Sequence, residues 1–97
     1  MDTTQKARVL AALTGFGDFA IRMRREGDWY CSLPRVEIKR GGLLESPTQS
    51  APTPEGAIDA AFAQYANPSE RVIVDAYGPK RREVQWNGYM WEDRNDR

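Results

Sequence analysis

The side chains that usually carry enzyme chemistry are scarce in this sequence. Its 97 residues include no histidine and one cysteine, Cys31. Histidine is the commonest general acid-base residue in enzymes. Its absence excludes Ser-His-Asp and Cys-His nucleophiles and nearly all zinc sites. Cys31 alternates with Trp29 and Leu33, a pattern that favours a small buried side chain over an activated nucleophile. We therefore expect no catalytic residue, no metal and no cofactor.

Carboxylates and glycine-rich segments do not replace the missing chemistry. Glu26 and Asp28 are close in sequence, but they fall in an expected turn and not in a cleft. The Gly-Phe-Gly segment at 15–17 lacks the third glycine and the preceding strand of a phosphate-binding loop, and the glycine pair at 41–42 is simpler as a turn. The sequence therefore predicts a protein that is not an enzyme.

Basic side chains are the better candidates for a functional surface. Arg22 and Arg24 fall on the polar side of an alternating strand. We expect this pair to meet Arg35 and Lys39 across a hairpin, where a phosphate backbone or an acidic protein surface would bind by charge. A second basic run at 80–82 precedes an aromatic hairpin. The predicted partner-binding residues are Arg22, Arg24, Arg35, Lys39, Arg40, Lys80, Arg81 and Arg82.

The alternative for these basic residues is an ordinary solvated sheet face, with Glu26 and Glu37 neutralising part of the charge. Fourteen basic and fourteen acidic residues give the chain a formal net charge of zero. The long-range positive field of a nonspecific nucleic-acid binder is therefore absent. Any site for a polyanion must be local.

The cellular setting is also indicated by what the sequence lacks. No apolar stretch approaches the ~18 residues needed to span a bilayer. The N-terminal residues do not have the charged and apolar segments of a secretory signal, and a lone cysteine cannot form an intramolecular disulfide. We expect a protein of the cytoplasm with no membrane segment.

The hydropathy pattern predicts a single α+β domain over residues 1–97, with two helices on one face of a mostly antiparallel sheet. Pro34 marks a change of apolar phase, and we expect a bulge or an edge position there. It would keep both apolar sets facing inward, that is, Trp29, Cys31 and Leu33 before Pro34 and Val36 and Ile38 after it. Residues 46–53 are expected to form a flexible polar loop, and residues 94–97 a frayed tail. In chain order we expect a helix over 4–13, strands over 18–25 and 29–40, a short strand over 43–45, a helix beginning at Thr53-Pro54-Glu55, a strand over 71–77 and a final hairpin.

The final hairpin has the strongest local signal. Asn87-Gly88 is typical of a two-residue type I′ turn, because both central positions of that turn need positive φ. Such a turn would place Trp86 opposite Tyr89 and, two residues further along each strand, Val84 opposite Trp91. We expect these four side chains to share one face.

A resemblance adds to these patterns. At the segments Gly41-Gly42-Leu43-Leu44, Thr53-Pro54-Glu55-Gly56-Ala57-Ile58 and Arg81-Arg82-Glu83-Val84-Gln85-Trp86-Asn87-Gly88-Tyr89-Met90-Trp91, the chain resembles small accessory proteins of tailed bacteriophages and prophages. The resemblance extends from about Trp29 to Asp93, and its motifs are structural. It implies a phage-encoded protein in the host cytoplasm, a class whose members often bind a host or defence component, anti-CRISPR proteins among them.

Three functions remain as hypotheses. The leading one is a non-catalytic interaction protein that inhibits a host protein or nucleoprotein complex, such as a CRISPR effector, by occluding a surface. The second is a nucleic-acid-binding protein that uses the basic sheet face, although the acidic start of the second helix at Glu55 opposes binding to double-stranded RNA. The third is a virion structural or assembly protein that dimerises through an exposed strand edge. We expect a monomer or a homodimer.

Overall fold

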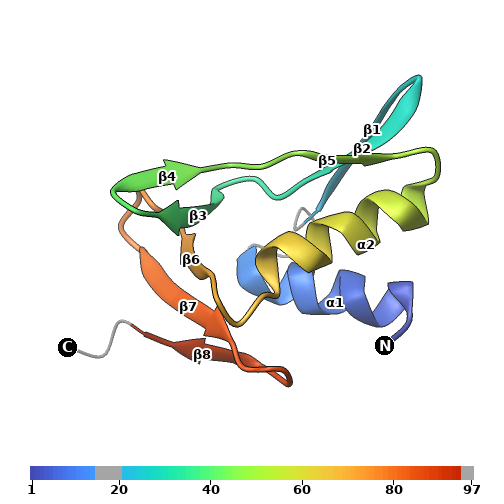
Figure 1. The fold of residues 1–97 in the computed structure, drawn as a ribbon. Coiled ribbons are helices and arrows are strands. Elements are labelled where there is room, and N and C mark those ends of the chain that lie inside the picture. Colours follow the sequence, from blue (N-terminus) through green and yellow to red (C-terminus); the bar gives the residue numbers. More distant parts are fainter. Residues whose placement is uncertain (15–20, 95–97) are drawn as a thin grey trace.

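Two helices and two antiparallel sheets make up the part of the chain that the computed structural model describes, residues 1–14 and 21–94 (Figure 1). In chain order the elements are α1 (Thr3–Thr14), β1 (Arg22–Glu26), β2 (Asp28–Ser32), β3 (Val36–Arg40), β4 (Leu43–Glu45), β5 (Gln49–Ala51), α2 (Pro54–Tyr65), β6 (Arg71–Val74), β7 (Arg82–Trp86) and β8 (Trp91–Asp93). One sheet has the strand order β1-β2-β5, and the other has the order β4-β3-β6-β7-β8. The predicted α+β class is confirmed, with two sheets in place of one.

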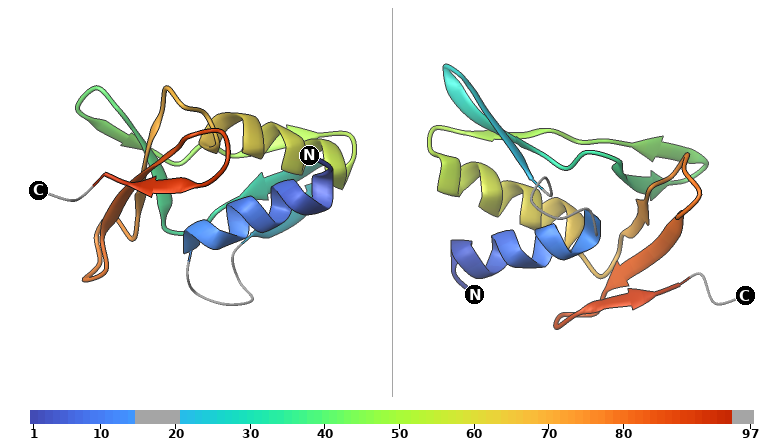
Figure 2. Two further views of the ribbon diagram at one scale, coloured as in Figure 1. Left: turned by 90° about the horizontal axis from the view of Figure 1, so that it is seen from below. Right: turned by 180° about the vertical axis from the view of Figure 1, so that it is seen from behind.

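The two helices pack against each other, and α2 also contacts β2 and β5. Figure 2 shows the five-stranded sheet at one end of the helix pair, with the β7–β8 hairpin reaching back toward α1. The β1–β2 hairpin extends away from this body at the opposite end (Figure 1). The molecule therefore has a packed body and one projecting hairpin.

Side chains cap the start of each helix. The Asp2 carboxylate accepts a hydrogen bond from the Gln5 amide at 2.8 Å, and the Gln5 side chain accepts one from the Asp2 amide at 2.9 Å. At α2, the Thr53 hydroxyl accepts from the Gly56 amide at 3.0 Å, with Pro54 at the first helical position. These bonds satisfy amides that have no partner within the helix.

One hydrophobic core joins the helices to both sheets. Tyr65 at the end of α2 is its largest fully buried side chain, and the phenol donates a hydrogen bond to the Val36 carbonyl at 3.3 Å. The other buried members are Leu10, Leu13, Cys31, Leu33, Val36, Ile38, Ala57, Ala61, Val72, Val74 and Val84. Every element from β1 to β7 except β4 contributes a buried or packed side chain, so neither sheet forms a core of its own.

The strand predicted over 29–40 is two strands that belong to different sheets. β2 ends at Ser32, a turn occupies Pro34 and Arg35, and β3 begins at Val36 in the other sheet. Arg35 has a φ of 65°, in the left-handed region. The predicted bulge or edge position is therefore wrong, because the backbone turns here instead of continuing. The prediction that both apolar sets face inward is confirmed by the burial of Cys31, Leu33, Val36 and Ile38.

The expected polar loop at 46–53 contains strand β5, which corrects that prediction. Trp29 lies opposite Ala51 and Cys31 opposite Gln49, so β5 completes the three-stranded sheet. Main-chain hydrogen bonds hold a strand whatever its side chains, and a segment without apolar alternation can therefore pair with an open sheet edge. Parts of two other predictions, residues 15–20 and 95–97, lie outside the described residues.

The final hairpin forms, but its register differs from the prediction. Trp86 lies opposite Trp91, and Gln85 opposite Glu92, so the loop has four residues, 87–90, instead of two. Gly88 still has a positive φ of 102°. The Asn87 side chain accepts hydrogen bonds from the amides of Tyr89 and Met90 at 2.8 and 2.9 Å. The side chain of Asn87 thus organises a wider loop than the dipeptide alone suggests.

Aromatic packing accounts for this register. The Trp86 and Trp91 rings lie edge to face at 5.1 Å between centroids, and Phe62 of α2 packs on Trp86 at 5.9 Å. The Trp91 indole donates a hydrogen bond to the Val9 carbonyl of α1 at 2.9 Å. A shift of two residues keeps the tryptophans on the core face, while Tyr89, predicted to join them, is 90% exposed.

We expect Asn87→Ala to lower the free energy of unfolding by about 1 kcal/mol, because two loop amides lose their acceptor. Urea denaturation measures this change. Asn87→Asp keeps an acceptor at the same place and should lie closer to the wild type. Equal losses in the two variants would show that the side-chain oxygen does not hold the loop.

Burial raises the pKa of the Cys31 thiol from 9.0 to about 11. The thiol ionises at a lower pH in the unfolded chain than in the folded protein. Its contribution to the free energy of unfolding is therefore fully present below pH 9 and is lost as the pH rises toward 11. Burial also raises the pKa of Tyr65, which adds to the same loss. We expect the free energy of unfolding to fall over this pH range, and to fall less steeply in Cys31→Ala. Identical slopes in the two proteins would contradict this assignment.

Candidate functional site

The predicted basic cluster does not form as a single surface. Arg22 lies opposite Ser32 and Arg24 opposite Tyr30, so neither arginine meets Arg35 or Lys39 across the hairpin. Lys39 lies in β3 of the other sheet, where its neighbour on β6 is Arg71. The expected pairing is wrong because the chain changes sheets between β2 and β3.

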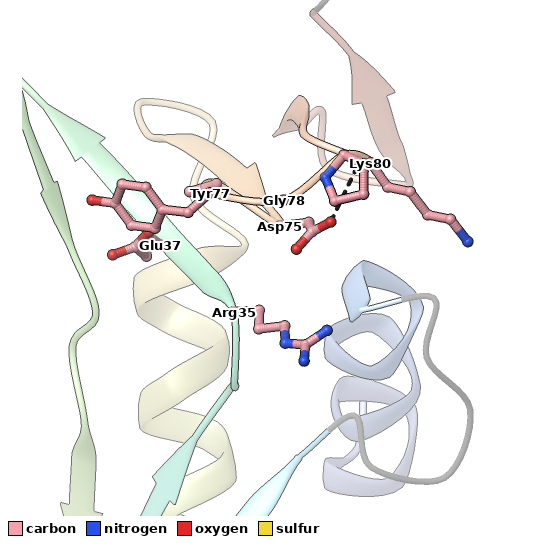
Figure 3. A pocket seen from close by; sticks show the side chains of 8 residues that line it. Arg35, Glu37, Asp75, Tyr77, Gly78 and Lys80 are labelled. Atoms are coloured by element: carbon pink, nitrogen blue, oxygen red, sulfur yellow. Dashed lines mark hydrogen bonds between the residues drawn. The ribbon is translucent and has the colours of Figure 1, made fainter.

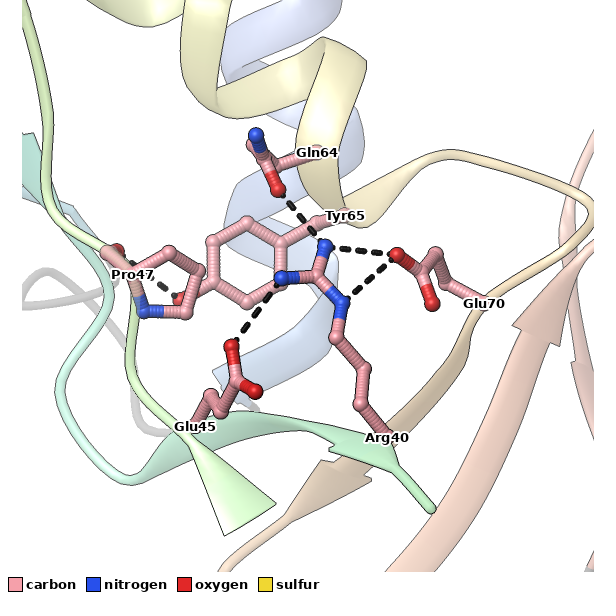
Figure 4. Close-up of polar contacts among 6 residues, drawn as sticks. All are labelled: Arg40, Glu45, Pro47, Gln64, Tyr65 and Glu70. Carbon is pink, nitrogen blue, oxygen red and sulfur yellow. Dashed lines mark hydrogen bonds and ion pairs between the residues drawn. The ribbon is translucent and has the colours of Figure 1, made fainter. Parts of the chain in front are cut away.

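Arg40 is held by its own chain, as Figure 4 shows. Its guanidinium donates to Glu70 at 2.8 Å, to Glu45 at 3.1 Å and to the Gln64 side chain at 2.8 Å. The hydrogen bond to Glu70 is the main cause of a raised pKa of Arg40. These contacts connect β3, β4, the end of α2 and the segment before β6, so Arg40 contributes to the fold and is less available to a partner than the sequence suggests.

The second basic run separates as well. Arg81 donates a hydrogen bond to the Ala76 carbonyl at 3.1 Å, and Arg82 is exposed at the start of β7. Lys80 lies elsewhere, on the wall of an open hollow of about 460 Å³ that Arg35 also lines. The structure thus brings together two cations that the sequence analysis assigned to different clusters.

The β1–β2 hairpin has the best-defined exposed basic face. Arg22 and Arg24 line a shallow hollow of about 360 Å³ together with Tyr30, Ser32 and Thr48. Tyr30 was not among the predicted site residues. Its position was available from the sequence, because Tyr30 alternates out of phase with Trp29 and Cys31 and therefore lies on the polar face. We call these five residues the hairpin face.

Contacts within the hairpin face orient its side chains without burying them. The Arg24 guanidinium lies 5.0 Å from the centroid of the Tyr30 ring, and its Nε atom lies 2.8 Å from a Glu26 carboxylate oxygen. The Arg24 and Glu26 side chains are both 63% exposed. Exposed contacts of this kind contribute little to stability, so the arginine is positioned yet remains accessible.

Charge is distributed unevenly along the hairpin. Arg22 lies at the end of β1 next to the body, whereas Glu26 and Asp28 lie opposite each other at the projecting tip. Like charges that face each other across a strand pair are unfavourable, and salt screens them only in part. The hairpin therefore presents Arg22 near the body and, at its tip, two carboxylates next to Arg25.

A metal-binding cluster or a membrane-spanning helix would each indicate a function. Residues 1–14 and 21–94 contain no group of three His, Cys, Asp or Glu side chains able to hold a metal ion. None of the helices described is long and apolar enough to cross a membrane. Comparison with known proteins gives no match to a family model, a curated protein or a solved structure. The resemblance to phage accessory proteins therefore stays a prediction.

The Arg40 contacts give a stability prediction. Arg40→Lys keeps the charge but cannot bond three partners at once, and we expect the free energy of unfolding to fall by about 1 kcal/mol. Arg82→Lys is the matched control, because Arg82 is exposed at a strand end, and its effect should stay within about 0.5 kcal/mol. Urea denaturation measures the free energy of unfolding of both variants. Equal losses in Arg40→Lys and Arg82→Lys would contradict this role for Arg40.

Proposed function

We propose that this protein is a non-catalytic binding protein that occupies a surface of a host or defence macromolecule, and that the hairpin face is its contact surface. The observation that carries the proposal is the projecting hairpin, which exposes Arg22 and Arg24 beside the half-buried Tyr30. None of these three side chains belongs to the hydrophobic core. They are therefore accessible to a partner without any change of the core.

The residue types of the hairpin face fit a protein contact. Arginine and tyrosine are enriched among the residues that dominate binding energy at protein interfaces. The ladder to β2, and the pairing of β2 with β5, hold these side chains on a defined backbone. A preformed backbone lowers the entropic cost of association.

The charge pattern favours a protein surface over a phosphate backbone. A row of phosphates would lie across the whole hairpin, and the carboxylates of Glu26 and Asp28 at its tip would repel it. Glu26 also offsets part of the charge of Arg24. A protein surface can present acidic groups to the arginines and basic groups to the tip, which gives complementarity over the full length.

Nucleic acid is the second candidate, and one observation favours it. Tyr30 lies beside Arg24, and Ser32 and Thr48 supply hydroxyl groups in the same hollow. An aromatic ring beside cations is how many proteins stack the bases of a single strand. Binding of this kind has a steep dependence on salt concentration, because phosphate contacts release counterions.

The test uses two charge-reversed proteins. Arg22→Glu with Arg24→Glu alters the hairpin face, and Lys39→Glu with Arg82→Glu makes the same change of charge at exposed positions of the other sheet. Each protein is mixed with purified CRISPR effector complexes and used for affinity capture from a bacterial host lysate. We expect the hairpin variant to bind the captured partner at least about tenfold more weakly, and the control to stay within about twofold of the wild type.

Two binding results would count against the proposal. One is a partner whose binding survives reversal of the hairpin face but is lost in the control. The other is capture that depends entirely on single-stranded DNA or RNA. In that case nuclease treatment of the lysate would abolish capture, and the protein would bind an oligonucleotide with a steep salt dependence. Turnover of a substrate by the isolated protein would contradict the non-catalytic part of the proposal.

A further inference from the structure

The hollow beside β3 and the turn after β6 selects no ligand by its charge. Arg35 and Lys80 line it together with Glu37 and the buried carboxylate of Asp75. That carboxylate already accepts a hydrogen bond from the Lys80 amide at 3.1 Å. Figure 3 shows the Arg35 and Lys80 side chains pointing in different directions. An open strand edge at the other end of the molecule is a more specific feature.

β1 is the longest open strand edge in the part of the chain that the structure describes. The outer strands of the two sheets are β1, β4, β5 and β8, and of these β1 has five residues whereas the others have three. β5 is also in contact with α2, while β1 lies on the hairpin that projects from the body (Figure 1). An edge strand leaves alternate amides and carbonyls without a partner in its own sheet. The outer side of β1 can therefore pair with a further strand.

The order of charges along β1 is complementary to itself. β1 begins with Arg22 and ends with Glu26, and both side chains lie on the same face as Arg24. In an antiparallel pair of two copies centred on Arg24, Arg22 of each copy lies opposite Glu26 of the other. Arg24 faces its counterpart, and its own Glu26 at 2.8 Å offsets part of that repulsion. Because the diagonal attractions and repulsions balance, the two Arg22–Glu26 contacts make the pairing attractive on this face.

The other face of β1 and the overall charge also permit this pairing. Met23 would lie opposite Arg25 of the second copy, where the aliphatic part of the arginine can pack on the methionine. The Arg25 guanidinium lies 5.8 Å from the centroid of the Trp29 ring in its own hairpin. The chain has a formal net charge of zero, so two copies do not repel each other at long range.

We propose that β1 pairs with β1 of a second copy of this chain, in the antiparallel register that places Arg22 opposite Glu26. The pairing joins the two three-stranded sheets into one sheet and closes on itself, because each copy uses the same edge. Both hairpin faces then lie on the same side of the joined sheet. Charged side chains deter other strands from an open edge, whereas a second copy matches their order. One strand pair is a small interface, so the dimer is weak and reversible.

Sedimentation equilibrium of the full chain, from micromolar to millimolar concentrations, measures the self-association. We expect the wild type to shift from monomer to dimer over this range. Glu26→Arg should weaken the dimer about tenfold, because both Arg22–Glu26 contacts become repulsive. Adding Arg22→Glu to Glu26→Arg restores opposite charges at both contacts, and association should return to within about threefold of the wild type. Glu92→Arg, the same reversal on exposed β8, is the matched control and should stay within about twofold.

Nuclear magnetic resonance of a mixture of isotope-labelled and unlabelled copies locates the contact. We expect intermolecular cross-peaks between Arg22 and Glu26, and slower amide exchange at alternate residues of β1 as the dimer forms. A monomer at every concentration, equal association of Glu26→Arg and the wild type, no recovery in the double variant, or intermolecular contacts at β4 or β8 in place of β1 would each overturn the proposal. The inference does not rest on the proposed function, because a monomer would still offer its hairpin face to a host partner.

Discussion

The turn at Pro34 and Arg35 is the constraint on which the rest of the structure depends. It passes the chain from the three-stranded to the five-stranded sheet, and the Val36 amide closes it on the Leu33 carbonyl at 3.3 Å. Proline holds a fixed φ, and Arg35 takes the left-handed conformation that reverses the chain. Because the turn reverses the side-chain phase, the apolar residues before and after it all reach one core.

The same turn separates two surfaces of the molecule. The arginines of β1 stay on a projecting hairpin, whereas Lys39 and Arg40 move to the other sheet. The carbonyl of Arg35 pairs with the amide of Asp75, which places the buried carboxylate beside the turn. A single reversal of the backbone thus leaves one exposed mixed-charge hairpin and one hollow with a carboxylate at its edge.

Local patterns predicted which face each side chain occupies better than they predicted its partner. The alternation around Cys31 and Val36 correctly indicated burial on both sides of Pro34. The register of the last hairpin was wrong, because contacts of Trp86 and Trp91 with α1 and α2 outweigh the preference of Asn87-Gly88 for a two-residue turn. Strand β5 was missed since its pairing with β2 leaves no periodic signal in a three-residue segment.

The candidate sites show the same limit. The outward direction of Arg22 and Arg24 follows from strand alternation, and Tyr30 could have been added by the same rule. The contacts of Arg40 could not have been predicted, because two of its three acceptors lie 24 and 30 residues further along the chain. The hollow beside Asp75 combines residues from two strand ends that only the folded sheet brings together.

The change of sheet at Pro34 and Arg35 is tested most directly by proton cross-peaks between backbones in nuclear magnetic resonance spectra of the free protein. The two-sheet fold predicts cross-strand contacts of Arg24 with Tyr30 and of Ile38 with Val72. Cross-strand contacts of Arg22 or Arg24 with Arg35 or Lys39 would show instead one continuous basic hairpin, and would contradict the separation of the two surfaces.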